Sequence, residues 1–160
     1  RGRSAEYVKI VTQCYHEAFE SIENKCFTKE KVAQWTTRLR SVYNRDFWGG
    51  YYLGRTMGEW ANRYGSQATR MKQHIGKITN YFGNIQVAEI HIETESLNVG
   101  DELLITGPTT GVYEDTAGEI RVDLQPVEKA NKGTYCSVPV SKLVRRGDQV
   151  YKWITVPDEF

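Results

Sequence analysis

Hydrophobic residues recur at helical spacing through the first part of the chain. Ser4, a residue type that favours helix N-caps, precedes an apolar stripe made by Tyr7, Val11, Cys14, Ala18 and Ile22. Thr28 has the same relation to a second stripe, made by Val32, Trp35, Leu39 and Val42. Spacings of three and four residues place side chains on one face of a helix. The pattern therefore predicts two amphipathic helices, followed over residues 45–75 by a loop with at most one short helical turn.

From Gly76 onward the hydrophobic pattern has a period of two, which is typical of strands. Apolar residues alternate with polar ones at three places: Ala88, Ile90 and Ile92; Ile120, Val122 and Leu124; Cys136, Val138 and Val140. Two similar segments, Leu97–Leu103 and Leu143–Val150, each carry a Gly-Asp pair that is expected to turn the chain into a strand. Short strands broken by Gly, Asn and Pro indicate a small antiparallel β-barrel of about six strands, closed or nearly closed.

The two patterns predict an α+β protein with two parts, a helical linker segment at residues 1–75 and a C-terminal β-barrel domain at residues 76–160. Charge divides the chain at the same place. Residues 1–75 carry 13 Lys and Arg against 7 Asp and Glu, whereas residues 76–160 carry 8 against 13. The net charge of +1 thus conceals a basic part and an acidic part.

Composition and cysteine usage favour a cytoplasmic protein. The hydrophobic share is 39%, and no apolar run approaches the roughly 20 residues that a membrane-spanning helix needs. The first four residues, RGRS, hold no apolar signal-peptide core. Because the three cysteines, Cys14, Cys26 and Cys136, are odd in number and far apart, neither a disulfide framework nor a cysteine-only zinc site is expected.

Several short motifs follow one another in a consistent order. Residues 1–8 read RGRSAEYV and lead into Tyr15 and Ala18, residues 44–51 read NRDFWGGY, and VAE, VGD and GP follow at 87–89, 99–101 and 107–108. In this order they resemble the region after the catalytic barrel in the collagenase-like peptidases, peptidase family U32. The last three motifs resemble that family's terminal β-domain, which is similar to the second domain of translation elongation factors. Asp46 departs from the family pattern, which has glycine there.

The resemblance implies a longer protein with an N-terminal α/β barrel that carries the family's cysteines. Members of the family act in tRNA or ribosomal RNA hydroxylation or in quinone hydroxylation, with an iron–sulfur cluster, or are peptidases. Arg1 matches a position just after the barrel, and the barrel's cysteine motifs are absent from these residues. The resemblance therefore implies a region with no cofactor or catalytic residues of its own, whose partner is that barrel.

The cysteines are the first candidates for local chemistry. Cys14 and His16 are two residues apart on a helix and so face different sides, and Cys14 lies in the apolar stripe, which favours a core thiol. Cys136 has an inward strand position and is also predicted to be core. Cys26 lies between the helices and is expected to be exposed, but no histidine accompanies it in the sequence.

Other motifs have simpler structural explanations. Glu89, His91, Glu93 and Glu95 share a strand face and include metal-ligand types, but neighbours on one face are roughly 6.6 Å apart, so a solvated face is favoured over a metal site. The segment Gly107–Gly111 is similar to a phosphate loop yet lacks the lysine and the following helix. Arg146-Gly147-Asp148 matches an adhesion tripeptide. Both segments are predicted to be turns.

Residues 35–75 carry the clearest functional signal. They hold seven Lys and Arg against two acids, together with eight aromatic residues. Cations can bind phosphate and aromatic faces can stack on bases, as in proteins that bind single-stranded RNA. The alternatives are an aromatic core covered by arginine stems, with Trp35 structural, and contact with the catalytic barrel. The predicted nucleic-acid-binding residues are Arg45, Trp48, Tyr52, Arg55, Arg63, Arg70 and Lys72.

The sequence thus predicts an accessory region that positions tRNA, ribosomal RNA or another macromolecular substrate near the N-terminal barrel. Two alternatives stay open. One is a self-contained cysteine hydrolase or peptidase, for which Cys26 would be the nucleophile. The other is a purely structural or oligomerisation module.

Overall fold

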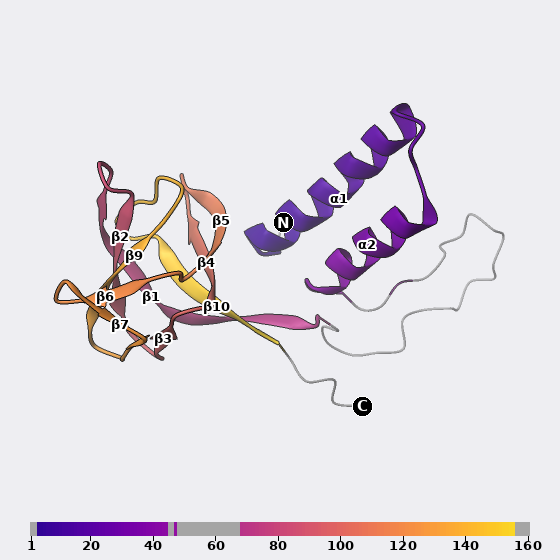
Figure 1. Cartoon of the computed structure of the whole chain (residues 1–160). Helices are drawn as coiled ribbons and strands as arrows, with labels where there is room; N and C mark the ends of the chain where they lie inside the picture. Colours follow the sequence, from indigo (N-terminus) through magenta and orange to yellow (C-terminus); the bar gives the residue numbers. More distant parts are fainter. Residues whose placement is uncertain (1–2, 45–46, 48–67, 156–160) are drawn as a thin grey trace. The chain divides into compact units, whose positions relative to one another are not determined.

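The computed structural model describes residues 3–44, 47 and 68–155, which fall into two compact units (Figure 1). The helical unit comprises Arg1–Met71 with Thr155–Phe160, and the strand unit comprises Lys72–Ile154. The α+β class is confirmed. Within the described residues, neither helix has the length and apolarity that crossing a membrane requires.

The helical unit is a hairpin of two helices, as predicted. Helix α1 spans Ala5–Glu23 and helix α2 spans Lys29–Arg40. Both predicted N-caps begin a helix, but they act differently. Thr28 Oγ1 accepts a hydrogen bond from Lys31 N at 3.4 Å, whereas the Ser4 side chain makes no capping hydrogen bond.

The predicted stripe of α1 is only partly correct. Cys14 is buried, but Ile22 is 57% exposed, and the neighbouring Ser21 is buried in its place. Ser21 follows Cys14 by seven residues, close to two full helical turns, and therefore lies on the same face of α1. On α2, Trp35 is buried as expected, which confirms its structural role, whereas Val32 of the predicted stripe is exposed.

The strand unit contains an eight-stranded, mostly antiparallel sheet and a two-stranded ribbon. The strand order in the large sheet is β5-β4-β10-β1-β2-β9-β6-β7, and β3 pairs with β8 in the ribbon. The strands are β1 (Arg70–Phe82), β2 (Val87–Ile92), β3 (Leu97–Asn98), β4 (Glu102–Gly107), β5 (Gly111–Thr116), β6 (Ile120–Val122), β7 (Gln125–Val127), β8 (Lys129–Ala130), β9 (Tyr135–Pro139) and β10 (Gln149–Thr155).

Two features of this sheet differ from the prediction. Among the described residues, β5 and β7 each have one neighbour in the sheet, so the sheet is open and the prediction of a closed barrel is wrong. Strand β1 begins at Arg70 rather than near Gly76. The hydrophobic pattern does not reveal this earlier start, because the first residues of β1 are half-buried or exposed on both faces and show no apolar alternation. The likeness to an elongation-factor domain stays a prediction.

The core of the strand unit lies on the inner face of the large sheet. Most of the predicted inward residues are buried: Ala88, Ile90, Ile92, Ile120, Cys136, Val138 and Val140. Val122 is only partly buried and packs against this core. Leu124, predicted to extend the β6 alternation, is instead 82% exposed. Val122 pairs with Gln125, so Asp123 and Leu124 form a two-residue turn, with φ values of 50° and 66°. Such a turn reverses the chain before Leu124 can join the strand.

The two similar Gly-Asp segments adopt the same local structure. Gly100 and Gly147 both have φ of 92°, a conformation that favours glycine. Asp101 Oδ2 accepts a hydrogen bond from Asn98 N at 2.9 Å, and Asp148 Oδ2 accepts one from Arg145 N at 2.8 Å. The internal similarity is therefore confirmed as a repeated turn. The segment Gly107–Gly111 is also a turn, which connects β4 to β5.

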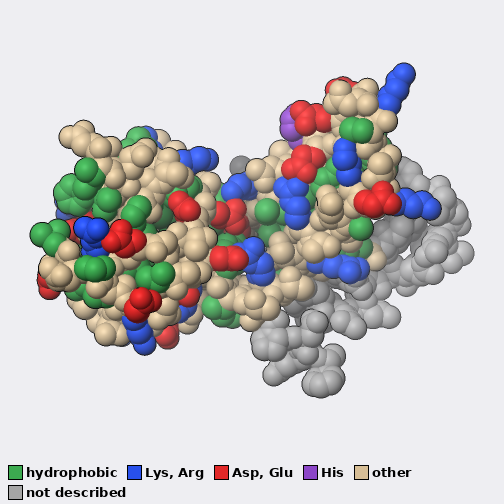
Figure 2. Space-filling view, in the orientation of Figure 1, with side chains coloured by type: hydrophobic (Ala, Val, Ile, Leu, Met, Phe, Trp, Pro, Cys, Tyr) green, Lys and Arg blue, Asp and Glu red, His purple; other side chains and the backbone are tan. Residues whose placement is uncertain are grey.

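Charged and hydrophobic side chains are interspersed over the surface of each unit (Figure 2). The exposed hydrophobic side chains of the strand unit include Phe82, Ile85 and Leu124. These side chains flank a cleft of about 440 Å³, which the β1–β2 and β6–β7 hairpins line together with Pro139.

Candidate functional site

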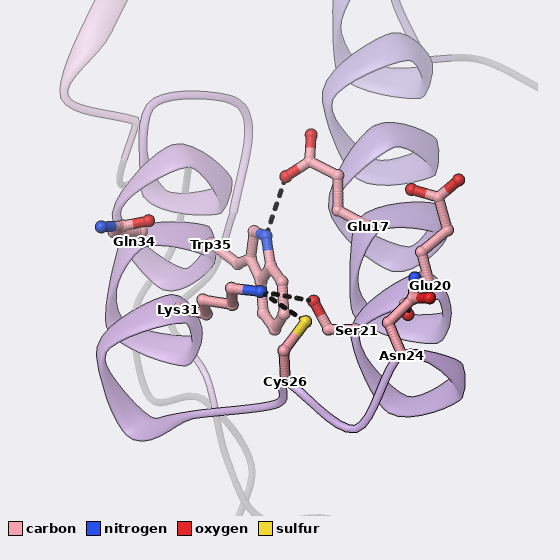
Figure 3. Close-up of a pocket in the computed structure, with 8 residues that line it drawn as sticks. All are labelled: Glu17, Glu20, Ser21, Asn24, Cys26, Lys31, Gln34 and Trp35. Carbon is pink, nitrogen blue, oxygen red and sulfur yellow. Dashed lines mark hydrogen bonds between the residues drawn. The ribbon is translucent and has the colours of Figure 1, made fainter.

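The helical hairpin encloses a polar pocket of about 310 Å³ where the chain passes from α1 to α2 (Figure 3). Helix α1 contributes carboxylates and a hydroxyl, the connecting loop contributes a thiol, and α2 contributes an ammonium group and an indole. The lining residues are Glu17, Glu20, Ser21, Asn24, Cys26, Lys31, Gln34 and Trp35.

Cys26 and Lys31 are in direct contact in this pocket. The Lys31 ammonium donates to Cys26 Sγ at 3.0 Å and to Ser21 Oγ at 3.2 Å (Figure 3). Lys25 has φ of 54°, and Cys26 N donates to Ser21 O at 2.8 Å. This tight turn brings the thiol back to the end of α1, while Thr28 starts α2 and presents Lys31 to the thiol.

The thiol is exposed and its electrostatic environment favours the thiolate. The hydrogen bond from Lys31 is the main reason that the pKa of Cys26 lies below its ordinary value. The contact with Ser21 and the charge of Lys31 lower the pKa further, while partial desolvation opposes them. A neighbouring cation and an accessible sulfur are the two features that distinguish reactive cysteines from structural ones.

The opposite wall of the pocket is a hydrogen-bonded network around Glu17. Its carboxylate accepts from Trp35 Nε1 at 2.9 Å and from Arg38 Nη1 at 2.6 and 2.8 Å. The hydrogen bonds from Arg38 first, and from Trp35 second, hold the pKa of Glu17 below its ordinary value. This network joins the two helices and holds the indole in the pocket wall.

The other two thiols are core residues, as predicted. Cys14 is 3% exposed, and its Sγ lies 3.9 Å from the carbonyl oxygen of Trp35. Burial raises the pKa of Cys14 above its ordinary value. Burial, with a smaller effect from Glu89, raises the pKa of Cys136 to about 12. Both thiols are therefore poor nucleophiles at neutral pH.

The β2 side chains for which the sequence favours a solvated face over a metal site contact neighbouring side chains. Glu89 Oε1 accepts from Thr79 Oγ1 at 2.6 Å, and Glu93 pairs with Lys77 at 2.7 Å. The His91 ring stacks on Tyr135 with 4.6 Å between centroids. No group of three His, Cys, Asp or Glu side chains in the described part of the chain could hold a metal ion. The residues described do not fit an iron–sulfur cluster either, because Cys14 and Cys136 are buried in different units.

The predicted nucleic-acid-binding residues are only partly described. Arg45, Trp48, Tyr52, Arg55 and Arg63 lie outside the described residues. The other two predicted residues begin β1.

Arg70 and Lys72 are both half-buried. The Lys72 ammonium lies 4.8 Å from the centroid of the Tyr151 ring. Arg40, in the same basic segment of the sequence, has its guanidinium 5.8 Å from the Phe47 ring. The nucleic-acid site stays a prediction.

Lys31 contacts Cys26, which the sequence pattern does not predict. It follows Cys26 by five positions and lies beyond the start of α2. The available signal was the N-cap residue Thr28, because the first turn of a helix after a short loop lies next to the end of that loop.

Comparison with known proteins identifies relatives over nearly the whole chain. Residues 1–62 match the model of peptidase family U32. A protein named "Collagenase" from Porphyromonas gingivalis strain W83 is 49% identical over 153 residues, which are 96% of this chain and 37% of the relative. A second Porphyromonas gingivalis "Collagenase" is 48% identical and is covered to 42%.

Two more distant similarities complete the comparison. An "Uncharacterized protease" from Methanocaldococcus jannaschii is 32% identical over 154 residues and is covered to 37%. The chain thus spans less than half the length of these relatives. A crystal structure of the C-terminal domain of a Geobacillus thermoleovorans protein described as a U32 peptidase superposes with a TM-score of 0.47 at 14% identity, over 49% of this chain and 96% of that one.

Proposed function

The chain belongs to peptidase family U32, and on this premise we propose that it is an accessory region that positions a macromolecular substrate for catalytic residues supplied outside it. Two arrangements support an accessory role. The relatives extend well beyond the matched segment, since the chain covers 37% to 42% of the two collagenases. In addition, two of the three thiols are buried with raised pKa values, which is unsuited to nucleophilic catalysis.

RNA is the first candidate for the substrate. The observation that carries this assignment is the basic and aromatic composition of residues 35–75, with seven Lys and Arg against two acids, next to an acidic second half. A basic segment of this composition attracts a polyanion. The described cation–ring contacts, Lys72 with Tyr151 and Arg40 with Phe47, bring together the groups that bind phosphates and stack on bases.

A polypeptide is the second candidate, and it rests on different observations. The relatives named collagenase and protease have names that imply protein substrates. The cleft beside Phe82, Ile85 and Leu124 has exposed apolar side chains of the kind that line peptide-binding grooves. A polypeptide bound there would be held mainly by apolar contacts, so its affinity would depend only weakly on salt.

Salt dependence distinguishes the two candidates. The chain is titrated with transfer RNA in gel-shift assays at about 50 mM and about 200 mM salt, and with gelatin in parallel. Phosphate contacts predict RNA affinity that falls steeply with salt. The double variant Arg55→Ala, Arg63→Ala should weaken RNA binding and flatten the salt slope with no loss of stability, and Lys129→Ala with Lys132→Ala serves as the charge-matched control from the strand unit.

Other outcomes reject the RNA assignment. Equal binding by wild type and double variant, or binding by neither, would remove it. Binding of gelatin alone would support the polypeptide instead. Loosening of the full-length protein by the double variant, without RNA binding, would show that the segment docks on the catalytic barrel. Self-association with neither ligand bound would favour a structural module, and peptide hydrolysis lost on Cys26→Ser would favour the cysteine hydrolase.

A further inference from the structure

The pocket of the helical hairpin contains reactive groups that a substrate-positioning role does not use. All three cysteines are described, and Cys26 is the exposed one, while Cys14 and Cys136 are buried. The Cys26 sulfur opens onto a cavity of about 310 Å³, large enough for a small molecule to approach it. Accessibility therefore directs any thiol chemistry of this chain to Cys26.

The carboxylates that line the pocket have other partners, and the Lys31 ammonium group faces the Cys26 sulfur. Two carboxylates line the same cavity, and both have other cationic or polar partners. Glu17 accepts hydrogen bonds from Arg38 and Trp35, and Glu20 lies 3.3 Å from the ring of His16. The Lys31 ammonium group donates hydrogen bonds to both Cys26 Sγ and the buried Ser21 hydroxyl. Its positive charge therefore lies where a thiolate would form.

We propose that Cys26 is a peroxide-reactive modification site, in which Lys31 holds the thiolate and the pocket admits hydrogen peroxide or a small organic hydroperoxide. The thiolate attacks the distal peroxide oxygen. A sulfur–oxygen bond forms and the oxygen–oxygen bond breaks, so sulfur is oxidised by two electrons and the peroxide is reduced. The departing hydroxide or alkoxide takes a proton from water or from Lys31 and leaves as water or an alcohol.

The product is a sulfenic acid at Cys26. A low-molecular-weight thiol condenses with it, forming a mixed disulfide and releasing one water molecule. Both products remove the negative charge that Lys31 faces. The contact between the loop and the first turn of α2 is thereby weakened at the point where the two helices are joined.

The test follows each cysteine of the folded chain separately. The chain is treated with hydrogen peroxide in the presence of dimedone, which traps sulfenic acid, and the adduct is measured peptide by peptide with mass spectrometry. Cys26 should carry the adduct and the two buried thiols should not. Near neutral pH, Lys31→Met should slow the reaction roughly 3- to 10-fold. The difference should vanish at high pH, where the thiol is ionised in either protein.

Three controls keep the result interpretable. Lys29→Met removes an exposed lysine from the same helical turn and should leave the rate unchanged, and Lys31→Arg should restore most of the wild-type rate. If Lys31→Met does not fold, the wild type suffices. Its alkylation midpoint at Cys26, measured from about pH 6 to about pH 10, must be lower in the folded chain than in urea. Identical rates for wild type and Lys31→Met, equal labelling of all three cysteines, or an unshifted midpoint would each overturn the proposal.

Discussion

The hydroxyl of Thr110 donates to Asp148 Oδ2 at 2.5 Å, which links two turns that are 38 residues apart in the sequence. The same carboxylate oxygen accepts from Arg145 N at 2.8 Å. Gly107 makes this close approach possible, since a Cβ at that position would lie 1.9 Å from Asp148 Oδ1. The two segments that resembled a phosphate loop and an adhesion tripeptide are thus bound to each other, and Asp148 is 3% exposed.

Replacing Asp148 with Ala should lower the free energy of unfolding by about 1–3 kcal/mol, because two part-buried donors lose their acceptor. Urea denaturation of the purified chain measures the change. Asp101→Ala is the matched control, since Asp101 makes the same turn but is only partly buried, and its side-chain donor is the local Asn98 amide at 3.3 Å rather than a residue of a distant turn. A loss for Asp101→Ala equal to or larger than that for Asp148→Ala would contradict the importance of the Thr110 link.

The register of β6 gives a second prediction. Ile120 is fully buried in the core, whereas its neighbour Arg121 is exposed and pairs with Glu119 at 2.8 Å. Ile120→Ala should cost about 2–5 kcal/mol. Arg121→Ala should cost under about 0.5 kcal/mol, because exposed ion pairs contribute little. Thermal or chemical denaturation tests both, and similar losses for the two variants would mean that the described register is wrong.

The turn between β6 and β7 contains a residue in an unfavourable conformation. Leu124 has φ of 66° and an exposed side chain, so glycine at this position relieves backbone strain and sacrifices little burial. Leu124→Gly should stabilise the chain by about 0.5–1 kcal/mol. Leu143→Gly is the control, because Leu143 is also exposed but is not among the residues with positive φ. Destabilisation by both glycines would reject the strain argument.

The network around Glu17 predicts how the helical hairpin responds to acid. The pKa of Glu17 is lower in the folded chain than in the unfolded chain, so its contribution to stability is complete above the unfolded-state pKa. The contribution is lost as the pH falls from there through the folded-state pKa. Glu17→Gln should therefore lose stability at neutral pH and show a shallower acid transition in far-UV circular dichroism. Glu23→Gln, an exposed position at the end of α1, should leave the transition unchanged.

The hydrophobic pattern predicted the helices and strands that bury one face and expose the other. Ile90 and Ile92 are buried and the Thr28 cap begins α2, as the spacing indicated. The failures occur where burial is not the deciding force. Leu124 is placed by the geometry of a two-residue turn. The first residues of β1, from Arg70, are half-buried or exposed and show no apolar alternation. Closure of the sheet depends on pairing between distant strands, which alternation within a strand does not specify.

The candidate site was predictable only in part. Exposure of Cys26 follows from its place between two helices, and burial of Cys14 follows from the apolar stripe. The partner of Cys26 does not follow from helical or strand periodicity. Lys31 reaches the sulfur because a left-handed residue, Lys25, turns the loop back against α1. That geometry is specific to the loop and leaves no periodic pattern in the sequence.

Lys72, the lysine of the predicted nucleic-acid site, has an aromatic neighbour in the structure. Lys72 lies 4.8 Å from the Tyr151 ring and begins the strand unit at the end of the basic segment. If Lys72 binds a phosphate, Lys72→Gln should reduce the magnitude of the salt slope for transfer RNA by about 0.7–0.9. Lys129→Gln, an exposed lysine on β8, should leave the slope unchanged. Equal slopes for wild type and Lys72→Gln would remove Lys72 from the site, and equal reductions by both variants would indicate a diffuse electrostatic attraction in place of a defined contact.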